Sequence, residues 1–190
     1  IAYCSVGRAH LLTMMSWGQL LQPDLNLGDS ILGLTPELIT RYRLKGLILD
    51  VDETLVPFKQ SQPLEDVCQW LKQIQSLTTV VLVSNNLSHS RISRIANTLG
   101  VPFYIAAGKP SRRKLRQAVA LMQLPHGEIA MVGDRLFTDV LGGNRLGLFT
   151  VLVEPMVSPL GKGASKQCLR NAEIWLSKRL GVVLAASKHL

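Results

Sequence analysis

The sequence predicts an α/β protein built on a single Rossmann-like, doubly wound parallel sheet. Short runs rich in valine, isoleucine and leucine recur along the 190 residues. The segments between these runs carry apolar residues three and four positions apart, which is the spacing of an amphipathic helix. Strands of a parallel sheet are apolar on both faces because helices cover both sides. The alternation therefore favours this fold, and the chain length suits one full-sized domain.

Five strands and three connecting helices follow from the pattern. The apolar runs are residues 46–51, 79–85, 103–107, 129–134 and 149–154. The helical faces between them consist of Leu64, Val67, Leu71 and Ile74 after Pro63; Ile92, Ile95 and Leu99 before Gly100; and Leu115, Val119 and Met122 after Pro110. Proline favours a first helical turn and glycine a helix end. Residues 55–79 and 87–108 leave no room for an inserted cap domain.

The two ends of the chain fall outside this pattern. Residues 1–40 are predicted to form an N-terminal segment that is partly irregular, and residues 41–190 the core with its C-terminal helix. Within the segment, residues 14–34 mix Trp17 and several leucines with acidic residues, so this stretch either docks on the core or inserts shallowly beside a bilayer. In the C-terminal helix an apolar stripe favours packing on the sheet over membrane contact; it consists of Leu169, Ala172, Leu176, Leu180 and Val183.

Composition limits the partners and the compartment. The formal charge of +8 favours an anionic partner such as a phosphate ester, an anionic lipid or a nucleic acid. Nucleic acid is the least favoured, because only 5% of the residues are aromatic and no RNA-binding signature is present. Cys4, Cys68 and Cys168 are odd in number and far apart, so they suggest neither a disulfide framework nor a zinc site, and the reducing cytoplasm is the expected compartment. No run reaches the roughly 18 apolar residues of a membrane span. Peripheral contact at the inner face of the membrane stays open.

Polar side chains follow the predicted strands at the points where these strands end. Asp50 and Asp52 follow the first strand, Ser84 and Asn85 the second, and Asp134 the fourth. Ligands of parallel α/β sheets bind at the carboxyl ends of the strands, near a reversal of strand order. Folding is therefore expected to bring these residues to one edge of the sheet.

The carboxylates at this edge indicate a cation site. Asp50 and Asp52 carry like charges that repel unless a cation or a proton lies near them. Asp134 and Asp139, five residues apart across a loop, add two more carboxylates. A set of oxygen ligands without clustered histidine or cysteine favours Mg²⁺ over zinc. Mg²⁺ is therefore the expected cofactor.

The rest of the set suits the chemistry of a phosphate group. An ionised aspartate can attack phosphorus and form an aspartyl-phosphate. A second carboxyl two residues further on can protonate the leaving oxygen and later activate water. Lys109, just after the third strand, and the Ser84 hydroxyl with nearby backbone N–H groups can neutralise the phosphoryl oxygens.

Four short motifs resemble, in order, those of the haloacid dehalogenase (HAD) phosphatases: "DVDET" at 50–54, "VSNN" at 83–86, "GKP" at 108–110 and "GDRLFTD" at 133–139. This resemblance implies that Asp50 is the nucleophile and Asp52 the general acid and base. It implies that Ser84, with Asn85 beside it, binds phosphate and that Lys109 holds the phosphate and the nucleophile. The implied Mg²⁺ ligands are the Asp50 carboxylate, the Asp52 backbone carbonyl and Asp134, with Asp139 in support.

Two longer stretches, residues 31–56 and 133–153, resemble the YqeG family of HAD subclass IIIA. That family is similar to mitochondrial phosphatidylglycerophosphate phosphatases, and the resemblance covers roughly residues 19–180. The departure from its pattern is Glu53, where relatives often carry asparagine or glycine. Little of the chemistry is expected to depend on this position.

The expected function is Mg²⁺-dependent hydrolysis of a phosphomonoester through an aspartyl-phosphate. The resemblance implies phosphatidylglycerophosphate, an anionic phospholipid, as the substrate, and an uncapped site suits a substrate of this size. Two alternatives stay open. One is a phosphatase for a soluble ester, such as a nucleotide or a sugar phosphate, and the other is a nucleic-acid- or ribosome-associated binding module on the same fold. The oligomeric state does not follow from the sequence.

Overall fold

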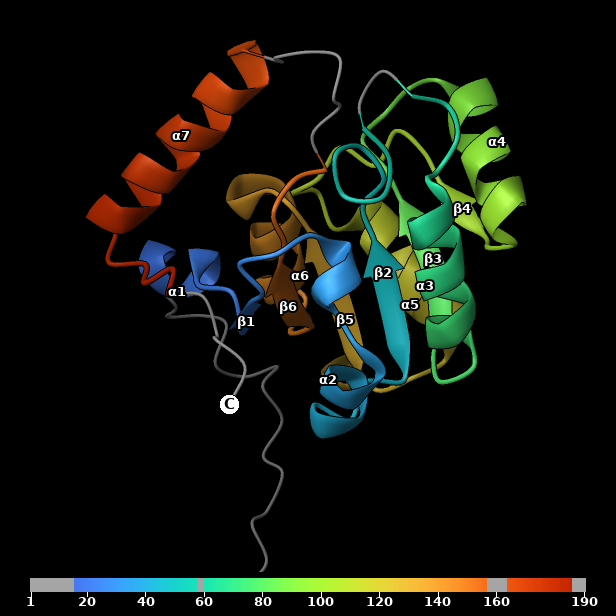
Figure 1. The fold of residues 1–190 in the computed structure, drawn as a ribbon. Helices are drawn as coiled ribbons and strands as arrows, with labels where there is room; N and C mark the ends of the chain where they lie inside the picture. Colours follow the sequence, from blue (N-terminus) through green and yellow to red (C-terminus); the bar gives the residue numbers. More distant parts are fainter. Residues whose placement is uncertain (1–15, 58–59, 157–163, 186–190) are drawn as a thin grey trace, which may run out of the picture.

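A six-stranded, all-parallel sheet forms the centre of the molecule (Figure 1). The structure is a computed structural model that describes residues 16–57, 60–156 and 164–185, with only the backbone for 164–170. The strand order is β1-β6-β5-β2-β3-β4. The strands are β1 (Leu25–Asn26), β2 (Gly46–Leu49), β3 (Thr79–Val83), β4 (Phe103–Tyr104), β5 (Ile129–Gly133) and β6 (Phe149–Leu152). The predicted fold class and all five predicted strands are confirmed.

Helices cover both faces of this sheet. The α-helices are α1 (Trp17–Leu21), α2 (Pro36–Arg41), α3 (Glu65–Gln75), α4 (His89–Leu99), α5 (Arg113–Met122), α6 (Leu141–Asn144) and α7 (Ala164–Arg179). Single turns are η2 (Ile31–Gly33), η3 (His126–Glu128) and the π-helical turn η4 (Leu136–Val140). The three predicted helices are present, although α3 begins one residue after Leu64, which is exposed.

The two faces of the sheet build separate apolar clusters, as successive residues of β2 illustrate. Leu47 and Leu49 pack in a cluster that the buried residues of α3 and α4 complete. Ile48, between them, packs in another cluster with Leu115 and Val119 of α5. This alternation explains why β2 is apolar throughout, because each of its side chains meets a covered face.

The sixth strand, β1, was not predicted. It pairs in parallel with β6 at the edge of the sheet. Asp24 Oδ2 accepts hydrogen bonds from the backbone N–H and the hydroxyl of Thr150, at 2.9 and 3.1 Å. A two-residue strand that contains Asn26 forms no apolar run, so the sequence pattern could not reveal it.

The described part of the N-terminal segment docks on the core. Leu21, Leu25, Ile31 and Leu34 are fully or almost fully buried. Trp70 of α3 donates a 2.8 Å hydrogen bond to the Leu34 carbonyl. The division of the chain at residue 40 stays a prediction.

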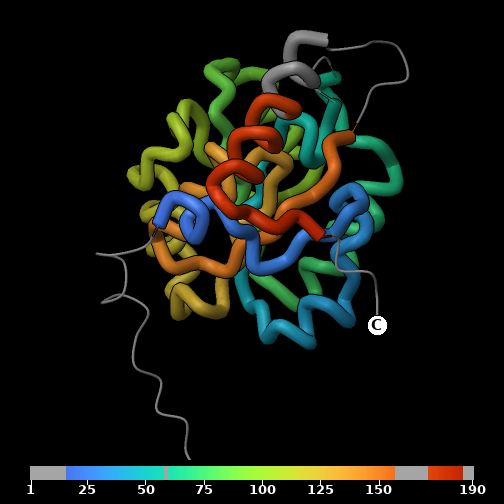
Figure 2. Tube along the Cα trace, turned by 90° about the vertical axis from the view of Figure 1, so that its left-hand side faces the viewer, coloured from blue at the N-terminus to red at the C-terminus, as the bar shows by residue number. Residues whose placement is uncertain are grey.

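The predicted buried face of the C-terminal helix is wrong. Ala172, Leu176, Leu180 and Val183 are exposed, whereas Glu173 and Ser177 are buried; the side chain of Leu169 lies outside the described residues. The reason is that α7 packs against η4 and not on a face of the sheet. In Figure 2, α7 (red) lies across the N-terminal elements (blue) at this side of the molecule.

The connections leave the sheet without a cap domain in the described residues, as predicted. Only α3 lies between β2 and β3, and only α4 between β3 and β4. Within the part of the chain that the structure describes, we find no helix long and apolar enough to span a bilayer.

Candidate active site

The strand order reverses beside β2, which pairs with β3 on one side and β5 on the other. Asp50 directly follows β2, and its backbone N–H still donates to the Val132 carbonyl of β5 at 2.9 Å. Asp134 directly follows β5. The two aspartates therefore lie at the carboxyl ends of neighbouring strands, where ligands of such sheets bind.

Asp50, Asp134 and Asp139 form a buried acidic cluster. One carboxylate oxygen from each residue lies within 4.8 Å of the others. The ammonium of Lys109, itself buried, lies 2.5 Å from Asp50 Oδ1 and 2.7 Å from Asp139 Oδ1. With all four groups ionised, one positive charge faces three negative charges. One divalent cation would neutralise the remaining negative charge.

The turn after β5 brings Asp139 to this cluster. Residues 136–140 form the π-helical turn η4, and the backbone N–H of Arg135 donates to Asp139 Oδ2 at 3.3 Å. Gly133 makes the approach possible, since a Cβ at this position would lie 2.3 Å from Asp139 Oδ2. The glycine that opens the fourth motif is therefore required by packing at the site.

Burial makes the negative charges of the cluster unfavourable in the absence of a cation. Burial raises the pKa of Asp50 to about 6, against the opposing effect of the Lys109 ammonium. The pKa of Asp134 is well above its usual value because of burial and the Asp139 and Asp50 carboxylates. Burial disfavours the charged form of Lys109, but Asp139 and Asp50 outweigh it and raise its pKa above the usual value. Lys109 is therefore positively charged at neutral pH.

The cluster has the donors that a hard cation needs. Asp139 Oδ1 is buried and accepts no hydrogen bond of good geometry, although Lys109 Nζ is close to it. Carboxylate oxygens are the ligands that Mg²⁺ prefers. Asp50, Asp134 and Asp139 therefore fit this ion, and Asp139 is a full member of the cluster because one of its oxygens lies within 4.8 Å of an oxygen of each of the other two. The Asp52 side chain is not part of the cluster, and the role of its backbone carbonyl stays a prediction.

The Asp52 carboxylate is held by α4 and the loop before it. Arg91 Nη1 lies 2.6 Å from Asp52 Oδ1, and Asn86 Nδ2 donates to Asp52 Oδ2 at 3.0 Å. Arg91 is fixed in turn by the Gln60 carbonyl, which accepts from its Nε at 2.9 Å. These contacts compensate the charge of Asp52 separately from that of Asp50.

Sequence reasoning missed Arg91. A signal was nevertheless present, because Arg91 lies in the first turn of α4. A cation at a helix N-terminus is disfavoured by the helix dipole. An arginine in this place therefore suggests a partner elsewhere in the fold.

The second motif holds the loop that carries Lys109. Asn85 Oδ1 accepts from the backbone N–H of Lys109 at 2.7 Å, and Asn85 Nδ2 donates to the Lys109 carbonyl at 3.1 Å. The Ser84 hydroxyl is buried and accepts from the Asn86 N–H at 3.0 Å. Asn85 therefore positions Lys109, and phosphate binding by Ser84 and Asn85 stays a prediction.

Glu53 has a left-handed backbone, with φ of 65°. Asparagine and glycine tolerate this conformation better than glutamate does. This explains why those residue types are expected at this position of the first motif. The turn is closed by the Glu53 N–H, which donates to the Val56 carbonyl at 2.9 Å.

An ion pair connects the site to the C-terminal helix. Arg135, next to Asp134, bonds through its guanidinium to the carboxylate of Glu173 on α7. A second contact, from Arg135 Nε to Glu173 Oε1, measures 3.2 Å. The burial of Glu173, which the sequence pattern did not predict, has this partner as its reason.

Comparison with known proteins places the site in a family context. Residues 106–158 match the family model of HAD-hydrolase-like proteins. The probable phosphatase YqeG of Bacillus subtilis (strain 168) is 34% identical over 132 residues, which are 70% of this chain and 77% of that protein.

Two further relatives are more distant or match a shorter stretch. The chloroplastic phosphatidylglycerophosphate phosphatase 1 of Chlamydomonas reinhardtii is 29% identical over 147 residues, covering 70% of this chain and 53% of that protein. The ribonucleotide monophosphatase NagD of Escherichia coli (strain K12) is 48% identical over 59 residues, covering 31% of this chain and 23% of that protein.

Proposed function

The chain belongs to the YqeG family of HAD-type phosphatases, and we propose that it hydrolyses a phosphomonoester with Mg²⁺ through an aspartyl-phosphate on Asp50. The observation that carries this proposal is the convergence of Asp50, Asp134, Asp139 and Lys109 at the reversal of strand order. A second carboxyl, Asp52, lies two residues from Asp50 and has separate partners.

In the first step the Asp50 carboxylate attacks phosphorus, and the bond between phosphorus and the ester oxygen breaks. Lys109 holds the Asp50 oxygen and attracts the phosphoryl oxygens. Protonated Asp52 gives its proton to the leaving alcohol. Asp52 is ionised by this step, and Arg91 and Asn86 stabilise the resulting carboxylate and keep it in place.

In the second step Asp52, now ionised, accepts a proton from water. The water oxygen attacks phosphorus, the bond to Asp50 breaks, and inorganic phosphate is released. Asp52 is protonated again and Asp50 is ionised again, so the cycle closes. When bound to Asp50, Asp134 and Asp139, Mg²⁺ supplies positive charge that neutralises the phosphoryl oxygens.

We propose phosphatidylglycerophosphate as the substrate. The similarity to the phosphatidylglycerophosphate phosphatase of Chlamydomonas reinhardtii supports this proposal, as does the absence of a cap domain in the described residues. An uncapped site leaves the edge of the sheet accessible to a headgroup that stays anchored in a bilayer. The exposed apolar and basic residues on α1, on α7 and in the segment directly after α7 supply further support.

These residues form what we call the α1–α7 patch: Trp17, Trp175, Leu176, Lys178, Arg179, Leu180 and Val183. Trp17 is 61% exposed and Trp175 57% exposed. The two elements lie in contact, since a Cβ on Gly18 would be 2.2 Å from the Leu180 carbonyl oxygen. Tryptophan beside basic side chains suits the interface of an anionic bilayer. We propose peripheral contact with such a membrane through this patch.

A second candidate substrate is a soluble ester such as a nucleotide. The similarity to NagD, whose name gives ribonucleotide monophosphates, favours it. That similarity covers only 31% of this chain, and we therefore rank it second.

The test measures phosphate release from phosphatidylglycerophosphate in detergent micelles with Mg²⁺, with a nucleoside monophosphate and p-nitrophenyl phosphate in parallel. We expect the lipid to be the best substrate and Asp50→Asn to abolish turnover of all three. Asp66→Asn, an exposed aspartate of α3, is the matched control and should keep activity. A clear preference for the nucleotide would overturn the lipid proposal. Unchanged turnover by Asp50→Asn would overturn the mechanism.

A further inference from the structure

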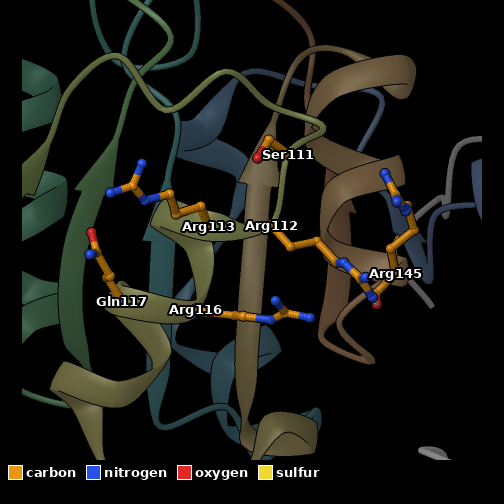
Figure 3. A pocket seen from close by; sticks show the side chains of 6 residues that line it. All are labelled: Ser111, Arg112, Arg113, Arg116, Gln117 and Arg145. Atoms are coloured by element: carbon orange, nitrogen blue, oxygen red, sulfur yellow. Dashed lines mark hydrogen bonds between the residues drawn. The ribbon is translucent and has the colours of Figure 1, made fainter.

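Four arginines line an open pocket at the start of α5 (Figure 3). The pocket has a volume of about 510 Å³ and is lined by Ser111, Arg112, Arg113, Arg116, Gln117 and Arg145. Arg112, just before α5, and Arg116 on α5 extend toward Arg145 in this view, whereas Arg113 points the other way. Positive charge is therefore concentrated in a small concave surface.

The ion pairs between described residues leave the arginines of the pocket without a carboxylate partner. The pKa of the Arg112 guanidinium is lowered by burial and by repulsion from Arg116 and Arg145. An anion that enters the pocket would relieve this repulsion.

Hydrogen bonds hold two of the arginines in place. Arg112 Nη1 donates to the Arg145 carbonyl at 3.2 Å, and Arg145 Nη1 donates to the Pro110 carbonyl at 3.3 Å. Arginines that are already oriented lose less conformational freedom when they bind an anion. The start of the ten-residue helix α5 adds positive potential from its free N–H groups.

The pocket is separate from the acidic cluster. Lys109 Nζ contacts Asp50 and Asp139, and none of these three residues lines the pocket. The two places are nevertheless joined along the chain, because Pro110 lies between Lys109 and Ser111.

We propose that this four-arginine pocket binds a phosphate-bearing anion with at least two negative charges, distinct from the ester hydrolysed at the acidic cluster. Guanidinium groups bind phosphate oxygens through pairs of N–H donors, which makes phosphate the fitting chemical class. The phosphate belongs to a soluble molecule or to the headgroup of a lipid, and the test separates these sources.

The first arm titrates pyrophosphate into the protein by calorimetry in the presence of EDTA. The double variant Arg112→Gln/Arg116→Gln should bind about tenfold more weakly than the wild type or worse. The single variant Arg116→Gln should also bind more weakly than the wild type. Because the Arg116 side chain is exposed, this variant is expected to fold even if the double variant does not. The control Arg41→Gln/Arg94→Gln removes two exposed arginines elsewhere and should change the affinity less than about twofold.

The second arm measures co-sedimentation with phosphatidylcholine vesicles that contain phosphatidic acid. Loss of pyrophosphate binding in the pocket variants supports the site with a soluble source. Loss confined to vesicle binding supports the site with a lipid source. Absence of binding in both arms, or equal weakening in the control variant, overturns the proposal.

Discussion

The guanidinium of Arg91 lies 2.6 Å from the carboxylate of Asp52, so a residue of α4 holds the proposed general acid and base. Asn86 binds the other oxygen of the same carboxylate. Together they hold Asp52 outside the acidic cluster, although Asp50 is only two residues away. The two aspartates of the first motif thus have different partners and can have different tasks.

Arg91→Gln tests this positioning through its dependence on the leaving group. An alkyl alcohol needs a proton when it leaves, whereas p-nitrophenolate is stable as an anion. We expect kcat/KM to fall about tenfold for an alkyl phosphate, because a misplaced Asp52 loses part of its contribution as a general acid. For p-nitrophenyl phosphate, kcat/KM should fall about threefold or less. Steady-state kinetics with both esters measures the difference. Arg94→Gln, one turn further along α4, is the control, and an equal loss for both esters would contradict the positioning role.

Asp52→Asn should separate the two chemical steps. With p-nitrophenyl phosphate, attack by Asp50 needs no acid, but release of phosphate still needs a base. We expect a burst of about one nitrophenolate per enzyme, followed by a rate about 10²- to 10⁴-fold below that of the wild type. Rapid-mixing absorbance measures the burst. Asp50→Asn should give neither burst nor turnover, and a burst from that variant would exclude Asp50 as the nucleophile.

Gly133→Ala tests the packing that places Asp139. The added methyl group would lie 2.3 Å from Asp139 Oδ2, so the carboxylate must move out of the cluster. We expect activity to fall at least about 100-fold and the free energy of unfolding to fall by about 1–3 kcal/mol, as in overpacked cores. Gly127→Ala is the matched control, since nothing lies within 4 Å of a Cβ there. Enzyme assays and urea unfolding measure the two effects, and wild-type activity in Gly133→Ala would contradict this account.

The sequence was sufficient for the parts of the fold that depend on local patterns. Each predicted strand is an apolar run, and each predicted helix carries one apolar face, so both signals lie within a short window. β1 has no such signal, because its pairing depends on contacts of Asp24 with Thr150, far along the chain. In α7 the helix was predictable, but its buried side depended on Arg135 as a partner for Glu173.

For the site, the sequence predicted which residues gather at the edge of the sheet but not which side chains pair with one another. Asp50, Asp134 and Lys109 follow strands, so the topology of a parallel sheet brings them to one edge. Side-chain partners do not follow from topology. The sequence could not pair Arg91 with Asp52, nor assign the Asn85 amide to the backbone of Lys109. Both assignments depend on the paths of the loops after β3 and β4.

The acidic cluster should make stability depend on pH and on Mg²⁺. The pKa of Asp50 is about 6 in the metal-free fold against an ordinary value of 3.8, so the folded state binds this proton more tightly than the unfolded state. The resulting stabilisation is fully present below pH 3.8 and is lost as the pH rises through 6. Its size is on the order of 3 kcal/mol. Asp134, whose pKa is also raised, acts in the same direction.

Urea unfolding at pH 4.5, 6 and 7.5 measures this dependence. In EDTA, we expect Asp134→Asn to be more stable than the wild type at pH 7.5. At pH 4.5 the difference in stability between the variant and the wild type should be smaller. Mg²⁺ should stabilise the wild type more at pH 7.5 than at pH 4.5, because the carboxylates must be ionised to bind it. A wild type that gains stability relative to Asp134→Asn as the pH rises in EDTA would contradict the raised pKa of Asp134.

The α1–α7 patch predicts a difference between binding to a membrane and turnover of a soluble ester. Trp17 and Leu176 are 61% and 42% exposed, so Trp17→Ser/Leu176→Ser removes apolar surface without opening a cavity in the core. We expect affinity for phosphatidylglycerol vesicles to fall about tenfold or more, from the lost transfer of two large side chains into the bilayer interface. Turnover of p-nitrophenyl phosphate should be unchanged.

The control is Leu77→Ser/Leu121→Ser, at two leucines outside the patch that are 47% and 52% exposed, and it should leave vesicle affinity unchanged. Vesicle flotation measures the affinities, and an equal loss in both double variants would mean that the patch is not the membrane contact.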